Sequence, residues 1–376
     1  MAGALVSSGA SVVRIALKRG QGALDATDLT RFPRDEGASA LRGFFRRPGL
    51  TLALLVRLVF RAGKGNKEGG RVGAALAWRD GLALADWARR LGGEVRFHAQ
   101  FASWEATAAW VAARVSRVPF SFELHSPFTF VRGRSLLRMK LLAADRITAI
   151  SEDARRRALV LAPEVASRLM LVRCGLDLRN IPARVSKGPD IVAVGSLVAR
   201  KGHDVLIDAV ARAAARRPGL TAVIVGEGPE RARLEARAHE RGAPVRFLGA
   251  LPEADALALS ASATIAVLAC RTAADGDEDG IPVALMEAMA AGTPVISTPV
   301  GGIAELLEEG RAGLLVPAGD AIGLATAIER LLGDAPLRER LARSGRAAVA
   351  ARHDLASCAR DLLAALGVPP PTGAAA

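Results

Sequence analysis

The segment that decides the fold reads IVAVGSLVARKGHDVLIDAVARA and runs from residue 191 to residue 213. Four aliphatic residues lead into a glycine turn, and the turn leads into a stretch with the apolar periodicity of a helix. A strand, a turn and a helix in this order are the first half of a βαβ unit. We therefore expect a parallel sheet that contains a strand at Ile191–Val194.

The same alternation continues to the end of the C-terminal half. Five more aliphatic runs are each followed by a turn and mostly by a helical pattern. This regularity predicts a doubly wound α/β domain over residues 186–350. The predicted strands are Thr221–Val225, Val245–Leu248, Thr264–Leu268, Pro294–Ser297 and Gly313–Val316, and the predicted helices are Leu285–Ala291 and one or two within Ala321–Ala348.

Residues 1–185 show a similar but less regular alternation and are expected to form a second α/β domain. Its first strand would follow a helical stretch at Met1–Ser8 instead of opening the domain ahead of a Gly-rich turn, so the usual first strand is either missing or lost with a misassigned start. In the remaining residues, 351–376, a helix at Leu355–Leu366 is a candidate to cross back to this domain. The predicted strands are Ser11–Leu17, Val95–His98, Phe120–Leu124, Arg146–Ile150 and Met170–Val172, and the predicted helices are Trp78–Leu91 and Ala102–Val115.

The positive charge is concentrated in the N-terminal half. Residues 1–190 hold 32 Lys and Arg against 16 Asp and Glu, and the rest hold 19 against 22, so the net charges are +16 and −3. The positive charge of the N-terminal half suggests a surface that binds an anionic partner, either nucleic acid or membrane headgroups. The alternative is a coding bias toward arginine. Nucleic acid is the weaker partner, because no interleaved aromatics or known binding module accompany the charge.

The cysteines and the apolar runs bound the environment of the chain. Cys174, Cys270 and Cys358 form no CxxC pair, so neither a zinc site nor a disulfide framework is indicated, and a reducing cytoplasm fits. No apolar run reaches the roughly 18 residues of a membrane span, and nothing at the N-terminus resembles a signal peptide. The segment Leu50–Phe60 is expected to be a buried helix of the N-terminal domain. The alternative is a helix that lies in a membrane interface.

The first chemical motif is the glycine turn after the strand at Ile191–Val194. Its candidate donor-binding residues are Gly195, Ser196, Arg200 and Lys201. Backbone amides at a turn, a helix N-terminus and a lysine together favour a diphosphate, because the helix dipole and the cation both attract the anion. The alternative is an ordinary tight turn with an exposed lysine.

A second glycine turn, GEG at residues 226–228, also follows a strand and precedes a helix. It is similar to a dinucleotide-binding fingerprint, but Arg231 stands where the third glycine of that fingerprint would be. A dinucleotide-dependent oxidoreductase therefore remains an alternative with an incomplete motif.

The third motif reads DGDEDGIPVALMEAMAAGTPVIST over residues 275–298. It places a carboxylate at Asp279, a turn at Gly280–Pro282 that includes Ile281, and a second carboxylate, Glu287, two helical turns later. Two carboxylates near one helix face can accept hydrogen bonds from the hydroxyl groups of one sugar-containing ligand.

A calcium loop is an alternative for the same segment. Asp275, Asp277 and Asp279 match the opening of an EF-hand loop, but Met286 occupies position twelve and Glu287 comes one residue late. A solvated acidic loop is the other alternative, and we expect no metal site here.

Together with FLGALP at residues 247–252 and PVGGIAE at residues 299–305, these motifs resemble family 4 glycosyltransferases of the colanic-acid and exopolysaccharide type, in order and spacing from Ile191 to Asp320. The resemblance implies a GT-B fold, in which two Rossmann-like domains face a cleft. It implies sugar transfer with retention from a nucleoside-diphosphate sugar, without a cofactor or an obligatory metal. The acceptor would be a glycan or a lipid-linked glycan, and the enzyme would be cytoplasmic, with peripheral contact to the inner membrane face.

The resemblance also implies roles for single residues. Glu287 would bind the donor ribose, Asp279 would meet the donor sugar, and the turn at Gly280, Ile281 and Pro282 would present its amides to that sugar. Lys201 would hold the diphosphate. In the N-terminal half, the stretch FSFELHS at residues 120–126 matches the family at His125, which would contact the transferred sugar, so His125, Lys201 and Asp279 are the predicted catalytic residues.

Three departures from the family pattern bear on activity. Asp279 replaces the usual glutamate, and Ser196 replaces an arginine, so that Arg200 would have to turn inward to supply the second cation. The opening strand and its Gly-rich loop are lacking. A catalytically inactive relative that still binds nucleotide or glycan is therefore the main rival interpretation.

Overall fold

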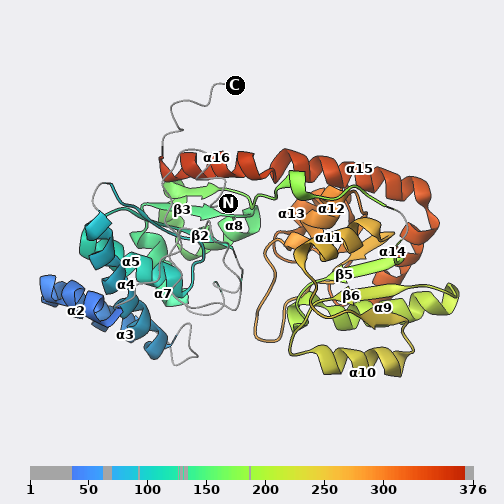
Figure 1. Cartoon of the computed structure of the whole chain (residues 1–376), viewed down its shortest axis with the longest axis horizontal. Coiled ribbons are helices and arrows are strands. Elements are labelled where there is room, and N and C mark those ends of the chain that lie inside the picture. The colour runs from blue at the N-terminus through green and yellow to red at the C-terminus, as the bar shows by residue number, and fades with distance from the viewer. Residues whose placement is uncertain are drawn as a thin grey trace. The chain divides into compact units, whose positions relative to one another are not determined.

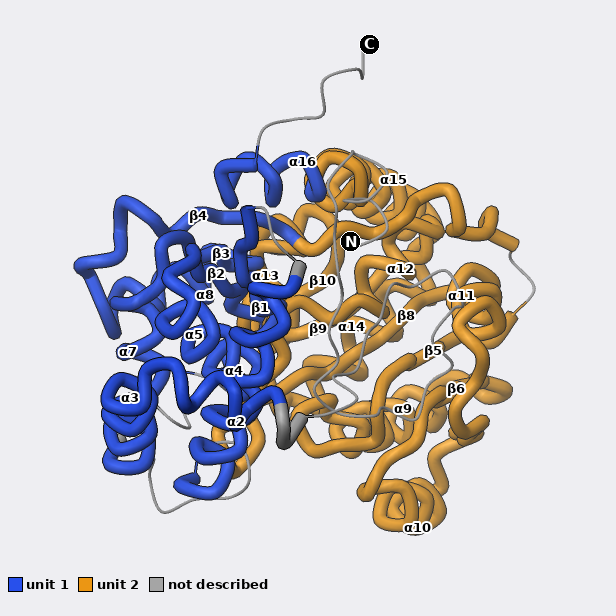
Figure 2. Tube along the Cα trace, turned by 60° about the vertical axis from the view of Figure 1, so that its left-hand side comes forward, with its two compact units in different colours: residues 1–173, 358–376 blue, residues 174–357 orange. Residues whose placement is uncertain are grey.

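The computed structural model describes residues 36–61, 70–91, 94–125, 127, 130, 134–185 and 188–368 (Figure 1). The chain divides into two compact units (Figure 2). Unit 1 comprises Met1–Arg173 and Cys358–Ala376, and unit 2 comprises Cys174–Ser357. The chain therefore leaves unit 1 once and returns to it near its C-terminal end.

Unit 2 is built on a six-stranded parallel sheet with the order β10-β9-β8-β5-β6-β7. All six strands predicted for this half form, and their bounds agree with the predictions to within one residue. The four residues of β6 and the three of β8 and β9 are buried, which explains why the sequence shows continuous aliphatic runs here instead of alternation. The strands are β5 (Ile191–Val194), β6 (Ala222–Val225), β7 (Val245–Phe247), β8 (Ile265–Val267), β9 (Val295–Ser297) and β10 (Leu314–Leu315).

Helices cover both faces of this sheet. In Figure 1, α11 and α12 lie above the strands and α9 lies below them. The long C-terminal helical pattern resolves into two helices, because Asp334 caps the second of them through a bond from the Leu337 amide. The helices are α9 (His203–Arg216), α10 (Arg231–Arg241), α11 (Glu253–Ser262), α12 (Val283–Ala291), α13 (Ile303–Leu306), α14 (Ala321–Gly333) and α15 (Ala335–Arg352).

The strand order of unit 2 reverses between β5 and β8. Ile191 of β5 lies opposite Ala222 of β6 on one side and opposite Ile265 of β8 on the other. In doubly wound sheets, ligands bind outside the carboxyl ends of the strands at such a switch point, because the loops there diverge. The loops that follow β5 and β8 are thus the place where the fold favours a site.

Within its described residues, unit 1 contains a four-stranded parallel sheet with the order β1-β2-β3-β4. Four of the five strands predicted for this half form, whereas Ser11–Leu17, the helical stretch Met1–Ser8 and the question of a first strand lie outside the described residues. The strands are β1 (Phe97–Ala99), β2 (Phe120–Leu124), β3 (Arg146–Ala149) and β4 (Leu169–Leu171), and the helices are α2 (Glu36–Arg46), α3 (Pro48–Arg61), α4 (Arg71–Leu91), α5 (Trp104–Ser116), α7 (Arg134–Ala143) and α8 (Glu152–Leu161).

The last helix, α16 (Leu355–Leu366), has the bounds expected from the sequence. Leu362 and Ala365 pack against Val172 of unit 1. The guanidinium of Arg96 donates a hydrogen bond of 3.1 Å to the carbonyl of Leu366. These contacts attach the C-terminal residues of the helix to unit 1.

The segment Leu50–Phe60 lies within α3 and is apolar on two sides. Leu54 and Leu58 are buried in the core of unit 1, whereas Leu52 and Phe60 are exposed. Of the helices within the described residues, none combines the length and the apolar character needed to cross a bilayer. The segment is a core helix with a second apolar face.

Candidate active site

The loop after β5 approaches the loop after β8 with its backbone. It runs through the 3₁₀ turn Ala199–Lys201 to Gly202, which has a φ of +65° and begins α9. A Cβ atom at this position would lie 1.8 Å from the carbonyl oxygen of Ala269. Only glycine fits both the backbone conformation and the space, so this residue sets how closely the two loops approach.

Lys201 and Asp279 meet at this approach. The Lys201 Nζ lies 3.0 Å from Asp279, and each side chain is only 12% exposed. The aliphatic stem of Lys201 lies beside Gly195, where a Cβ atom would be 3.5 Å from the Lys201 Cδ and Cε. The structure thus brings together two of the predicted catalytic residues from segments 78 positions apart in the sequence.

Arg200 turns toward the same carboxylate. Its Nη1 lies 2.7 Å from Asp277 and its Nε lies 3.3 Å from Asp279. Burial lowers the pKa of Arg200, but Asp279 and Asp277 outweigh it, so the net direction is upward. Ser196, at the position where the resemblance led us to expect an arginine, is exposed, and Arg200 is the second cation beside Asp279.

Cys270 completes the surroundings of Asp279 and was not predicted as a site residue. Its Sγ lies 3.3 Å from the Asp279 Oδ2. Burial, followed by the charge of Asp279, raises the pKa of this thiol well above its usual value, so the protonated thiol donates to the carboxylate. Cys270 is the third residue after β8, a strand at the switch point, and this place in the sequence could have indicated a site residue.

The carbonyl groups of the turn after Asp279 are in contact with the backbone of Gly301 and Gly302, whereas two of the turn's amides are left without an acceptor in the described part of the chain. Gly301 has a φ of +57°, and a Cβ atom there would lie 2.1 Å from the Asp279 carbonyl oxygen, while the amide of Gly302 donates to the Gly280 carbonyl at 2.8 Å. Among the described residues, none accepts a hydrogen bond from the amides of Gly280 or Ile281. These amides are available to an acceptor on a ligand.

Pro282 is the N-cap of α12 and offers no side-chain cap, which leaves the helix start open. Glu287 lies one further turn into α12 and is half-buried. Burial, with a smaller contribution from Glu253, raises its pKa. Glu287 forms no ion pair or hydrogen bond with Lys201 or Asp279, so it stands apart from their cluster.

A cavity of about 350 Å³ lies at the carboxyl ends of β5, β6 and β7. Gly195 and Ser196 line it from the first loop, and Gly226 and Glu227 line it from the second glycine turn. Its volume lies within the range of small-molecule sites, roughly 300–1,000 Å³. The cavity adjoins Lys201 through Gly195.

His203 is the first residue of α9 and is buried below the glycine turn. Burial lowers its pKa to about 4, although the backbone of Ser196 and of Gly195 acts in the opposite direction. The imidazole is therefore neutral at pH 7. It contributes packing and polarity beneath the turn and no positive charge.

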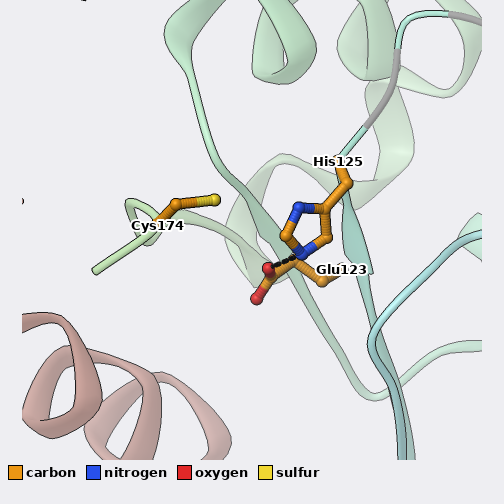
Figure 3. A group of neighbouring side chains, drawn as sticks. All are labelled: Glu123, His125 and Cys174. Carbon is orange, nitrogen blue, oxygen red and sulfur yellow. Dashed lines mark ion pairs between the residues drawn. The ribbon is translucent and has the colours of Figure 1, made fainter. Parts of the chain in front are cut away.

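In unit 1, His125 forms an ion pair with Glu123 (Figure 3). The hydroxyl of Thr148 donates to the other oxygen of Glu123 at 3.3 Å. Glu123 is buried, and the ring of Phe101 packs 4.9 Å from that of His125. His125 was predicted from the sequence and Glu123 was not, although a carboxylate inside an apolar strand is a signal, since buried acids are rare unless paired.

The sequence is similar to known sugar-transferring proteins. Residues 177–348 match the family model of the glycosyl transferases group 1. The chain is 36% identical to the putative colanic acid biosynthesis glycosyltransferase WcaL of Salmonella typhimurium over 164 residues. This aligned region covers 42% of this chain and 40% of that protein. The chain thus spans about two fifths of that relative's length.

A second relative extends the match. The GDP-mannose-dependent alpha-(1-6)-phosphatidylinositol monomannoside mannosyltransferase of Mycobacterium tuberculosis is 32% identical over 236 residues, or 58% of this chain and 61% of that protein. Among solved structures, Anabaena HepE in complex with UDP and glucose has a TM-score of 0.66 at 20% identity and covers 78% of this chain and 82% of its own. This likeness shows the fold, and the predicted GT-B fold is confirmed.

Proposed function

We propose that this chain, whose residues 177–348 match the family model of the glycosyl transferases group 1, transfers a sugar from a nucleoside-diphosphate sugar to a glycan or lipid-linked glycan. The observation that carries the proposal is the convergence of Lys201 and Arg200 on Asp279 at the switch point of unit 2. A relative's named role in colanic acid biosynthesis supports an acceptor in cell-surface polysaccharide synthesis.

In this proposal the donor diphosphate takes the place of Asp279 at the side chain of Lys201. Without the donor, the carboxylates of Asp279 and Asp277 neutralise the two cations, so the cluster is balanced. A bound diphosphate supplies that negative charge instead and frees Asp279 to accept hydrogen bonds from the donor sugar. The open amides of Gly280 and Ile281 add donors beside it.

The nucleoside would occupy the cavity lined by Gly195, Ser196 and Gly226, and Glu287 would accept hydrogen bonds from the ribose hydroxyls. The bond between the sugar's anomeric carbon and the diphosphate oxygen breaks, and the acceptor oxygen bonds to that carbon on the same face. The acceptor proton passes to the departing diphosphate. Lys201 and Arg200 stabilise the negative charge that develops on the diphosphate, which is electrostatic catalysis.

Unit 1 is proposed to receive the acceptor, and His125 to contact the transferred sugar. The net charge of +16 over residues 1–190 supports a peripheral position at an anionic membrane face, at the cytoplasmic side where nucleotide sugars would be used. We assign no cofactor and no metal, because Asp277 and Asp279 of the acidic loop are paired with Arg200 and Lys201.

The test is transfer and hydrolysis on a panel of UDP- and GDP-sugars with a membrane lipid extract as acceptor source. We expect turnover by the wild type and its loss in Glu287→Ala, because a hydrogen bond to a charged acceptor contributes about 1.5–3 kcal/mol. Glu339→Ala is the matched control, since this glutamate on α15 is 73% exposed. Turnover that survives Glu287→Ala unchanged would contradict the proposed donor site.

The same assay addresses the rival interpretation of an inactive relative. Tight nucleotide binding without turnover for any sugar or acceptor fraction would support a binding protein. Equal binding of NAD in place of nucleoside diphosphates would instead favour an oxidoreductase.

A further inference from the structure

The exposed apolar side chains are concentrated on three consecutive helices. Eleven large apolar side chains of the described residues are exposed, and six of them lie between residues 41 and 72. Scattered exposed apolar residues are ordinary, but a concentration of this kind marks an interaction surface. Its members are Leu41 and Phe45 on α2, Leu52, Val56 and Phe60 on α3, and Val72 on α4.

The spacing of these residues places them on one side of each helix. Leu52, Val56 and Phe60 follow each other every four residues on α3, and their exposed fractions are 53%, 46% and 81%. Side chains four residues apart lie on the same helix face. On the other side of α3, Leu58 is fully buried. The exposed row is therefore not required for the core of unit 1.

The charges beside this row are uniformly positive. Residues 37–61 contain five arginines and no acidic residue. Within the described residues, Arg46 and Arg47 form no ion pair, whereas Arg42 is engaged by Asp86 and the guanidinium of Arg57 lies 6.0 Å from the ring centroid of the buried Trp110. An amphipathic helix with an exposed apolar row and unpaired arginines is complementary to a surface that is apolar below and anionic above.

We propose that α2 and α3 form a membrane-docking surface that inserts Leu52, Val56 and Phe60 into an anionic lipid leaflet. Arg46 and Arg47 would pair with the lipid phosphates. This inference deepens the proposed function, since it rests on that function for the choice of a lipid surface, and it assigns the membrane contact to a defined face of unit 1. A leaflet fits better than an acidic protein, because lipid supplies both the apolar layer and the uniform negative charge.

The experiment is vesicle flotation of the full chain with phosphatidylcholine vesicles and with vesicles containing phosphatidylglycerol. We expect binding to the anionic vesicles, at least tenfold weaker binding to the neutral ones, and a decrease when salt is raised. The triple variant Leu52→Ser, Val56→Ser and Phe60→Ser should bind at least tenfold more weakly, and Arg46→Gln with Arg47→Gln should remove the preference for anionic lipid.

The control is Val160→Ser with Ile322→Ser, which removes two exposed apolar side chains elsewhere and should leave vesicle binding unchanged. Melting temperature and nucleotide binding should match the wild type in all variants, so that failure of the lipid inference is distinguishable from failure of the proposed function. Absence of wild-type vesicle binding would overturn the inference. So would a wild-type dimer that the triple variant converts to a monomer without any effect of lipid, since the row would then bind a second copy of the chain.

Discussion

Each unit holds one of the proposed catalytic residues against a carboxylate, but the two pairs are built differently. In unit 2, Lys201 pairs with Asp279 across 78 positions of sequence, and both side chains retain some exposure. In unit 1, His125 pairs with Glu123, which lies two residues earlier on β2 and is 3% exposed. A third group supports each carboxylate: Cys270 in unit 2 and, in unit 1, the hydroxyl of Thr148.

The two pairs differ in whether a ligand can replace the carboxylate. We infer that a diphosphate can replace Asp279 beside Lys201, whereas Glu123 stays beside His125. The partners of Asp279 come from a loop and a turn, so a ligand diphosphate can replace the carboxylate without disturbing a strand. Glu123 lies in the buried strand β2 opposite Thr148 of β3, and His125 follows directly after this strand. The account therefore predicts that Lys201 acts on substrate directly, whereas Glu123 acts through the position of His125.

The largest expected effect follows from Lys201→Ala. Removal of a preorganised charge that faces the departing diphosphate should lower kcat/KM about 100- to 1,000-fold. Steady-state transfer kinetics measure this effect. Arg216→Ala is the control, because Arg216 also pairs with a carboxylate of unit 2, Glu329, but at a 70% exposed position on the surface. Equal decreases of kcat/KM in the two variants would contradict the assignment of Lys201 to the departing diphosphate.

A smaller effect is expected from Glu123→Gln. The amide keeps the size of the carboxylate but not its charge, so His125 loses a charge-assisted hydrogen bond of about 1.5–3 kcal/mol. We expect kcat to fall roughly 10- to 100-fold while the KM for the donor stays near the wild-type value. Glu164→Gln, which removes an exposed ion pair with Arg138, is the control. An increase of KM alone would place Glu123 in donor binding instead.

Cys270→Ala should have a weaker effect. The thiol offers Asp279 one weak hydrogen bond, so its loss should cost about 0.5–1.5 kcal/mol in transition-state binding, a roughly 2- to 10-fold decrease of kcat/KM. Cys358→Ala, at another buried cysteine, serves as the control for packing. If both variants lose the same activity, Cys270 has no special role at Asp279.

The smallest effect concerns stability. The pKa of Glu287 is raised in the folded state, so ionisation of this group opposes folding, and the cost grows as pH rises from the usual value of 4.5 through the raised pKa. Glu287→Gln should remove the cost and raise Tm by roughly 1–3 °C at pH 7, with the gain vanishing near pH 4. Melting curves at both pH values test this. A lower Tm of the variant at pH 7 would refute it.

Most of unit 2 could be predicted from the sequence, because the pattern of apolar residues within short windows indicates its strands and helices. The strands β6, β8 and β9 are fully buried, mainly aliphatic runs, and β5 leads directly into a glycine turn. The glycine turn and Lys201 could be named for the same reason. The pairing of Lys201 with Asp279 was not predictable, because it depends on the strand order that makes β8 a neighbour of β5.

Unit 1 shows the limit of local patterns. The periodicity of Leu50–Phe60 predicted an apolar helix but could not distinguish a core helix from an interfacial one, because α3 is apolar on both sides. The carboxylate of Glu123 inside an apolar strand was a local signal, but its partner Thr148 comes from the neighbouring strand and could not be predicted from a sequence window.

The most direct test of the central claim is calorimetric titration of UDP, GDP and ADP, and of their nucleosides, into the wild type and Lys201→Ala. The account predicts that at least one nucleoside diphosphate binds the wild type more tightly than its nucleoside does. In Lys201→Ala that diphosphate should bind at least tenfold more weakly, whereas nucleoside binding should not change. Equal affinity of the wild type and the variant for every diphosphate would contradict the claim that the diphosphate replaces Asp279 at Lys201.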